Sequence, residues 1–117
     1  MHKPNPVSHL AFARASTGRS EQLGVRLSSL IEPALNAPGC LQFSLQQSLH
    51  EPDMWVVSGM WASEEMMSAW FETPELSVFA ELVQQLIVSS LDFQTFQHVT
   101  SVQAKANYQP PMQQLAG

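Results

Sequence analysis

Residues 41–61, LQFSLQQSLHEPDMWVVSGMW, determine how the rest of the chain can be arranged. Apolar and polar side chains alternate over residues 41–46, which is typical of a strand with one buried face. HEPD, residues 50–53, has the composition of a turn. MWVVSGMW, residues 54–61, is rich in residues that favour strands. The stretch therefore predicts a β-hairpin.

A helical pattern precedes this hairpin. Ser16 or Thr17 can cap the start of the helix, and Pro38-Gly39 can end it. Between these signals, apolar residues recur at helical spacing and predict one buried stripe. The stripe consists of Leu23, Leu27, Leu30, Ile31 and Ala34.

A second helical pattern follows the hairpin. Ser63 can cap its start, with Glu64 and Glu65 in the first turn, where a helix favours negative charge. Thr73-Pro74 interrupts this pattern as a cap followed by a proline at the first helical position. The apolar stripe expected beyond it consists of Leu76, Phe79, Val83, Leu86 and Ile87.

Strand-like segments at both ends complete the fold. VSHLAFAR, residues 7–14, predicts the first strand, and DFQTFQHV, residues 92–99, predicts the last. The order β-α-β-β-α-β predicts an α+β, ferredoxin-like domain over residues 6–99, with a four-stranded antiparallel sheet and helices on one face. Residues 100–117 show no period and predict an extended or flexible tail.

The third strand suggests a homodimer. Apolar side chains occupy both of its faces, although helices can cover only one face of the sheet. We therefore expect two copies to pack sheet toward sheet. The two sets are Met54, Val56 and Met60 on one face and Trp55, Val57 and Trp61 on the other.

Composition excludes several classes of function. Charged residues make up 13% of the chain and the net charge is −5, which argues against nucleic-acid binding and gives no support for an anionic membrane surface. No apolar run is long enough to span a bilayer, and the first ten residues contain no secretory signal. A single cysteine, Cys40, excludes an intrachain disulfide, so we expect a cytoplasmic protein. The histidines show no metal-ligand spacing, and no dinucleotide fingerprint is present, so we expect no metal and no cofactor.

The hairpin and the helix after it resemble the antibiotic biosynthesis monooxygenase domain family, part of the dimeric α+β barrel group. The features that carry the resemblance are PGCLQF, HEPD, WASEE and ETPELSVF. The resemblance extends over residues 6–99 and implies a dimeric α+β barrel. This family includes oxygenases, isomerases and haem-degrading enzymes.

The resemblance also bears on chemistry. Members that oxidise aromatic polyketides without metal or flavin are thought to bind substrate between the sheet and the helices, where the substrate anion reacts with oxygen. Trp61 matches a tryptophan of the quinone-forming type, which implies a catalytic role for it. The asparagine and tyrosine of that type are replaced here by Val57 and Met67.

Two further branches of the family match less well. Many bacterial members carry histidines in the second helix, and the matching positions here are occupied by Trp70 and Glu75. The haem-degrading branch has a tryptophan matching Trp70, but its axial histidine falls near Val83 and its first-strand asparagine near Ala13. Without that histidine, a haem iron has no evident protein ligand.

Several side chains are candidates for a site that binds a small aromatic molecule. His9 and His98 are the expected bases, because imidazole titrates near neutral pH. Gly59 leaves the sheet surface open, so we expect a hollow beside Trp61. The residues expected to contact substrate are Trp61, Met67, Trp70 and Phe71.

Alternative functions use the same residues. The first hypothesis is a cofactor-independent monooxygenase acting on an aromatic or quinol-like substrate in an apolar cavity. The alternative is a non-catalytic dimeric module that binds a small molecule or acts in a stress response. Carbonyl isomerisation and haem binding or degradation are further, less favoured alternatives.

Overall fold

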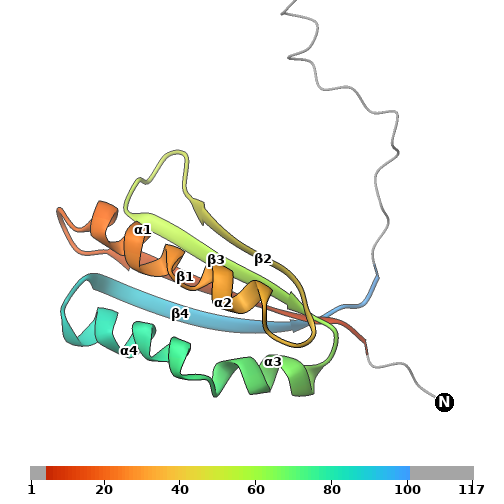
Figure 1. Cartoon of the computed structure of the whole chain (residues 1–117). Helices are drawn as coiled ribbons and strands as arrows, with labels where there is room; N and C mark the ends of the chain where they lie inside the picture. The colour runs from red at the N-terminus through yellow and green to blue at the C-terminus, as the bar shows by residue number, and fades with distance from the viewer. Residues whose placement is uncertain (1–4, 101–117) are drawn as a thin grey trace, which may run out of the picture.

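The structure, a computed structural model, describes residues 5–100. Of the expected tail at residues 100–117, all but Thr100 lies outside the described residues. The elements, drawn in Figure 1, are β1 (Val7–Ala15), α1 (Ser20–Ser28), α2 (Ile31–Leu35), β2 (Cys40–Gln47), β3 (Met54–Trp61), α3 (Glu64–Phe71), the 3-10 helix η1 (Pro74–Leu76), α4 (Ser77–Gln84) and β4 (Val88–Gln97).

The four strands form one open antiparallel sheet in the order β2-β3-β1-β4. The helices all lie on one face of this sheet (Figure 1). This arrangement confirms the ferredoxin-like α+β fold. The two central strands are β1 and β3, and β1 also pairs with β4, so the first and last strands of the chain are neighbours.

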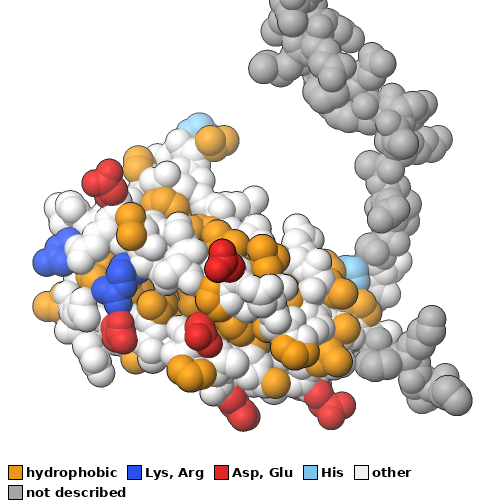
Figure 2. Space-filling view, in the orientation of Figure 1, with side chains coloured by type: hydrophobic (Ala, Val, Ile, Leu, Met, Phe, Trp, Pro, Cys, Tyr) orange, Lys and Arg blue, Asp and Glu red, His pale blue; other side chains and the backbone are white. Residues whose placement is uncertain are grey.

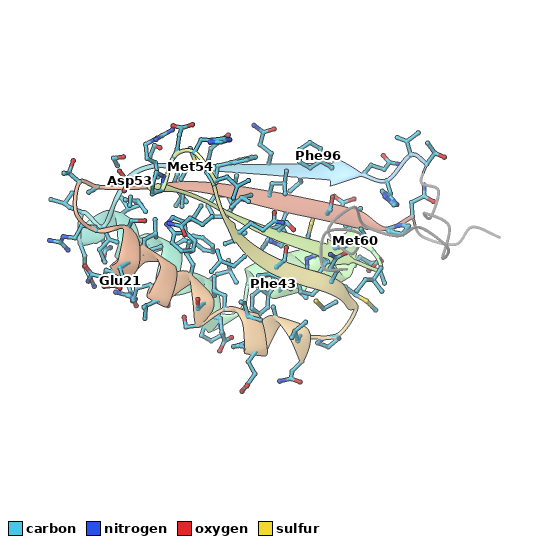
Figure 3. The ribbon with its side chains drawn as sticks, turned by 90° about the horizontal axis from the view of Figure 1, so that it is seen from above. Glu21, Phe43, Asp53, Met54, Met60 and Phe96 are labelled. Atoms are coloured by element: carbon cyan, nitrogen blue, oxygen red, sulfur yellow. The ribbon has the colours of Figure 1, made fainter. Side chains whose placement is uncertain are left out.

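The core lies between the sheet and the helices. Ala11 and Ala13 of β1 have no exposed surface, and their small side chains let the helices pack close to the sheet. Opposite them on β3, Val57 pairs with Ala11 and Trp55 pairs with Ala13. The register therefore places Trp55, Val57 and Trp61 on the helix-covered face, which we call the inner face. Figure 3 shows the same two layers from another side, with Phe43 between the sheet and the helices.

The first helical segment differs from its prediction in two ways. It starts later than predicted, and it is divided into two helices, α1 and α2, with a break at Ser29 and Leu30. The predicted stripe is correct, since Leu23, Leu27, Leu30 and Ala34 are buried. The predicted N-terminal cap at Ser16 or Thr17 is wrong, because the N-cap residue of α1 is Arg19 and makes no side-chain capping bond. A turn closed by the bond from Arg19 N to Ser16 O occupies this place, with Gly18 at φ +79°.

The second helical segment confirms one cap and corrects another. Ser63 caps α3, and its hydroxyl accepts a hydrogen bond from Met66 N. Thr73 makes no capping bond and instead donates its hydroxyl to Trp70 O, because a 3-10 turn and not an α-helix begins at Pro74.

The apolar stripe expected after Thr73 is wrong at two positions. Leu82 is buried in place of Val83, and Leu86 is 72% exposed. The reason is that α4 ends at Gln84 and Leu86 takes a positive φ of 58°, so the helical period stops before it. Ile87 is buried nonetheless, just before β4 begins at Val88.

The hairpin contains one irregularity. Cys40 pairs with Trp61 and Gln42 pairs with Met60, so Leu41 has no partner on β3. Leu41 is therefore the extra residue of a bulge and is exposed, although its alternation with Phe43 predicted a buried side chain.

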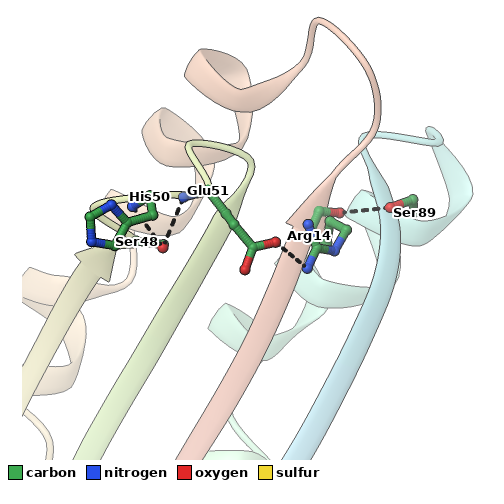
Figure 4. Close-up of polar contacts among 5 residues, drawn as sticks. All are labelled: Arg14, Ser48, His50, Glu51 and Ser89. Atoms are coloured by element: carbon green, nitrogen blue, oxygen red, sulfur yellow. Dashed lines mark hydrogen bonds and ion pairs between the residues drawn. The ribbon is translucent and has the colours of Figure 1, made fainter.

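Polar contacts hold the loop between β2 and β3. The hydroxyl of Ser48 accepts hydrogen bonds from the backbone nitrogens of His50 and Glu51, at 3.3 and 3.1 Å (Figure 4). Glu51 also pairs with Arg14 at the end of β1, at 3.1 Å. These contacts confirm the predicted turn at residues 50–53 and hold His50 in this exposed loop.

Candidate functional site

Five aromatic rings from four separate elements meet on the inner face of the sheet. His9 comes from β1, Phe43 from β2, Trp61 from β3, and Trp70 and Phe71 from the end of α3. We call these five residues the aromatic cluster. Ring centroids lie 5.0 Å apart for His9 and Phe71, 6.0 Å for His9 and Phe43, and 5.7 Å for Trp61 and Trp70. Offset and edge-to-face pairs at such distances are favourable, so the cluster is a closely packed unit.

Gly59 makes room for the imidazole in this cluster. It is the partner of His9 across the β1–β3 pair. A Cβ atom at Gly59 would lie 2.6 Å from Cε1 of His9 and 3.0 Å from both a ring carbon of Phe43 and Nε1 of Trp61. The absence of a side chain at Gly59 therefore leaves the expected space beside Trp61, but the His9 ring fills it.

His9 and Trp61 are joined by a buried hydrogen bond. Nε1 of Trp61 donates to Nδ1 of His9 at 3.2 Å, and the two rings are nearly parallel, with an interplanar angle of 22°. Trp61 has no exposed surface and His9 is 3% exposed. Because no water-sized space touches the indole, Trp61 does not line an open cavity in this conformation.

Burial sets the protonation of His9. Removal of its ring from water lowers the pKa of His9 from 6.5 to about 4. An imidazolium would be poorly solvated among these rings, so the neutral form is favoured. His9 is therefore an uncharged imidazole at neutral pH.

A pocket of about 500 Å³ lies at one end of the sheet, and no residue of the aromatic cluster lines it. We call it the α3 pocket, because the first turn of α3 forms one wall and the ends of β1 and β4 form the other. Met67, one turn before Trp70 and Phe71, lines it, and so does Thr95, the β4 partner of His9. The full lining is Asn5, Val7, Ser63, Glu64, Glu65, Met67, Thr95, Phe96 and Gln97.

The structure brings together five of the six residues predicted for the site. His9, Trp61, Trp70 and Phe71 are in the aromatic cluster, and Met67, buried one turn before Trp70 and Phe71 on α3, lines the α3 pocket. The sixth, His98, follows the end of β4, where its backbone nitrogen donates to Pro6 O at 3.0 Å. It belongs neither to the cluster nor to the pocket lining.

Sequence reasoning missed other parts of the site. Phe43 was assigned only to a buried strand face, and nothing in its alternation with polar residues marks it as a neighbour of His9. Glu64, Glu65 and Thr95 line the α3 pocket, but helix-dipole and strand patterns explain their positions equally well. Gly59 was the signal that could have found the contact, because a glycine within an apolar strand indicates a close approach of another group.

Trp55 forms a separate contact at the far end of β3. Its Nε1 donates to the hydroxyl of Ser20 at 3.0 Å, and its ring lies against Gly24 of α1, where a Cβ would come within 2.5 Å. Trp55 therefore fixes α1 to the sheet and is not part of the aromatic cluster.

Other reactive groups in the described residues offer no second centre. Among residues 5–100, no group of three or more His, Cys, Asp and Glu side chains is placed to hold a metal ion. Burial raises the pKa of the Cys40 thiol, which disfavours the reactive thiolate. On the helix-bearing face, charged side chains are scattered among hydrophobic ones and form no basic patch (Figure 2). None of the described helices is long and apolar enough to cross a bilayer.

Comparisons with known proteins agree on one family. The model of the antibiotic biosynthesis monooxygenase family matches residues 6–82. The fold is similar to that of a protein from Pseudomonas aeruginosa (20% identity, TM-score 0.76, 86% of this chain and 100% of that chain covered).

Two candidate antibiotic biosynthesis monooxygenases also share the fold. One is from Deinococcus radiodurans (18% identity, TM-score 0.75, 86% and 99% covered) and the other from Nitrosomonas europaea (15% identity, TM-score 0.73, 85% and 95% covered). At these identities the similarity shows the shared fold alone. No curated protein matches the chain.

Proposed function

Because the chain belongs to the antibiotic biosynthesis monooxygenase family, we propose that it is a cofactor-independent monooxygenase of small phenolic or quinol-like substrates. The observation that supports this proposal most strongly is the convergence of His9, Trp61, Trp70 and Phe71 from three elements on one buried spot. An aromatic substrate would find stacking partners there, and His9 would supply a polar contact for its oxygen.

The α3 pocket is the proposed entrance. Its volume of about 500 Å³ lies within the usual range for small-molecule pockets. Met67 lines it one helical turn before Trp70 and Phe71 of the aromatic cluster, and an unbranched methionine side chain can change rotamer readily. Substrate would displace the Met67 side chain and place its ring against Trp70 and Phe71.

The proposed reaction needs only dioxygen as oxidant. A phenol that carries a hydrogen on the ring carbon opposite its oxygen loses its O–H proton to solvent water as it enters the site, and dioxygen attacks that carbon. One oxygen atom remains on that carbon as a quinone oxygen. The other leaves as water with the hydrogen of that carbon and the phenolic proton. The protein would contribute orientation and exclusion of bulk water.

A second candidate, a non-catalytic small-molecule-binding module, is favoured by one observation. The cluster is closed around Trp61, and the low pKa of His9 makes it a weak proton acceptor. Such a module would bind aromatic molecules through the same rings without consuming oxygen.

Oxygen uptake separates the two functions. Purified, metal-free protein would be mixed with a panel of phenols and polyphenols that carry a hydrogen on the ring carbon opposite a hydroxyl group, while dissolved oxygen and tryptophan fluorescence are recorded. A monooxygenase consumes oxygen faster than the protein-free control. Fluorescence quenching without oxygen uptake would overturn the proposed activity and leave the binding module.

A second tryptophan on β3, Trp55, provides the matched control for this experiment. Trp61→Phe removes the indole donor of the cluster, and Trp55→Phe removes an indole donor on the same strand and face, outside the cluster. We expect the rate of oxygen uptake to fall about 100-fold in Trp61→Phe, which is the usual effect of removing one hydrogen-bond donor from an active site. Trp55→Phe should keep the rate of the unsubstituted protein.

The proposed enzyme is a homodimer formed by sheet-to-sheet packing. On the face of the sheet away from the helices, Leu10 and Phe12 of β1 lie beside Val56 of β3, and none of the helices in residues 5–100 covers them. A second copy of this sheet would remove these side chains from water, which is the usual driving force for such packing.

A further inference from the structure

The hydrogen bond between Trp61 and His9 has only one direction. An indole nitrogen carries a hydrogen and has no lone pair to offer, so it can only donate. Nδ1 of His9, 3.2 Å from it, must therefore accept with its lone pair. A neutral imidazole carries one proton, and that proton must then lie on Nε2.

The surroundings of His9 keep it neutral. Phe43 from β2, Trp61 from β3 and Phe71 from α3 pack around it, and its β4 partner is Thr95, so none of these neighbours carries a charge.

The charged and titratable groups lie farther out on the same elements. Glu64 and Glu65 are exposed in the first turn of α3, and the Cys40 thiol lies at the start of β2. The two ion pairs of the described residues, Arg14–Glu51 and Arg26–Glu81, do not include His9.

The Nε2 atom of His9 has no partner among the described residues. Within residues 5–100, this nitrogen makes no hydrogen bond, and the bond from Trp61 is the sole hydrogen bond of the imidazole. No buried side-chain nitrogen or oxygen in the same part of the chain lacks a partner. It follows that Nε2 is not fully buried and keeps a small part of the 3% of His9 that is exposed.

We infer that Trp61 is a positioning residue that holds His9 as the neutral Nε2–H tautomer, so that His9 donates a hydrogen bond to an oxygen atom of the substrate. The part of this inference that concerns substrate rests on the proposed function. In this role His9 does not take the proton of the substrate, because its basic nitrogen is already occupied by the indole. The site then favours molecules that present an acceptor oxygen, such as a phenolate or a quinone carbonyl.

Nitrogen NMR of protein labelled at histidine tests the tautomer directly. Long-range correlations from the ring hydrogens identify which nitrogen carries the proton. We expect His9 to show a protonated Nε2 and an unprotonated Nδ1, without change between about pH 5 and 8, the range in which an ordinary histidine titrates. A proton on Nδ1, or titration within this range, would overturn the inference.

Substitution of the two tryptophans shows whether Trp61 holds the tautomer. In Trp61→Phe the donor is lost, so both nitrogen signals of His9 should move toward the average of the two tautomers. In Trp55→Phe they should stay in place. Unchanged His9 signals in a folded Trp61→Phe variant would overturn the positioning role.

A naphthoquinone probes the donor role, because its carbonyl oxygens can only accept hydrogen bonds. Its addition to the unsubstituted protein should shift the Nε2 signal of His9 and leave the signals of His50, in the β2–β3 loop, unchanged. Binding without a shift at Nε2, or no binding, would overturn the donor role even if the tautomer is confirmed. Oxygen uptake decides the proposed activity separately, so failure of the two can be distinguished.

Discussion

At the scale of single residues, the site depends on an uncharged His9 ring that packs against Gly59 of β3. Gly59 supplies the space, Trp61 supplies the hydrogen bond, and burial lowers the pKa of the imidazole to about 4. None of these three facts follows from the type of residue alone. A histidine in a strand predicted a base, whereas its neighbours make it a hydrogen-bond acceptor toward Trp61.

The low pKa of His9 predicts a specific pH dependence of stability. Because the pKa is about 4 in the folded protein and near 6.5 in the unfolded chain, the unfolded chain binds the extra proton first. Stability is fully present above about pH 6.5 and is lost as the pH falls toward about 4, by about 3 kcal/mol in total.

Urea unfolding at a series of pH values, compared with His9→Phe, measures this effect. All other ionisable groups are the same in both proteins, so the difference between the two curves isolates His9. The unsubstituted protein should lose stability relative to the variant over this interval. Parallel curves would mean that His9 is charged or exposed in the folded state.

Gly59→Ala should destabilise the protein by about 1–3 kcal/mol, the usual cost of forcing an extra methyl group into a packed core. The new Cβ would meet Cε1 of His9 at 2.6 Å, so the imidazole must move. The double variant His9→Ala, Gly59→Ala provides the control, measured by urea unfolding. Its cost should be smaller than the sum of the single costs, because removal of the imidazole relieves the clash. Additive costs would contradict the contact.

At the scale of elements, the sequence predicts the strands of the hairpin well and the limits of the helices less well. The predicted strands at 41–46 and 54–61 match β2 and β3 closely, because a period of two and a turn composition are local signals. The start of α1 and the end of α4 depend on backbone turns at Gly18 and Leu86, which side-chain periodicity does not reveal.

The aromatic cluster could be predicted only in part, for a related reason. His9, Trp61, Met67, Trp70 and Phe71 were each identifiable as candidates, but their meeting depends on the strand register and on the position of α3. The register pairs His9 with Gly59, and this pairing cannot be read from either strand alone.

Ser63 is the residue that fixes the start of α3 and one wall of the α3 pocket. Ser63→Ala should cost about 1 kcal/mol of stability, because the backbone nitrogen of Met66 loses its capping partner. Ser68→Ala, an exposed position on the same helix, should change stability by no more than about 0.5 kcal/mol. Thermal unfolding of both variants measures the difference, and equal effects would show that the cap contributes nothing.

At the scale of the whole molecule, the two faces of the sheet have different surroundings and different proposed roles. The inner face carries the core and the aromatic cluster, while the opposite face bears apolar side chains that none of the described helices covers. In the proposed dimer the second face holds the two copies together.

The dimer leads to a prediction for Phe12. We expect the unsubstituted protein to be a dimer by light scattering coupled to gel filtration, and Phe12→Glu to be a monomer, because the dimer would bury an unpaired carboxylate. Val25→Glu, on the exposed side of α1, should remain a dimer. A monomeric unsubstituted protein, or a dimeric Phe12→Glu, would contradict sheet-to-sheet packing.

The most direct test of the central claim follows the oxygen atoms themselves. The protein would be incubated with a phenol that supports oxygen uptake, under dioxygen labelled with heavy oxygen, and the products weighed by mass spectrometry. The account predicts a quinone with one labelled oxygen atom, formed by the unsubstituted protein and by Trp55→Phe but about 100-fold more slowly by Trp61→Phe. A product without label, or equal rates in the two variants, would contradict a monooxygenase built on the aromatic cluster.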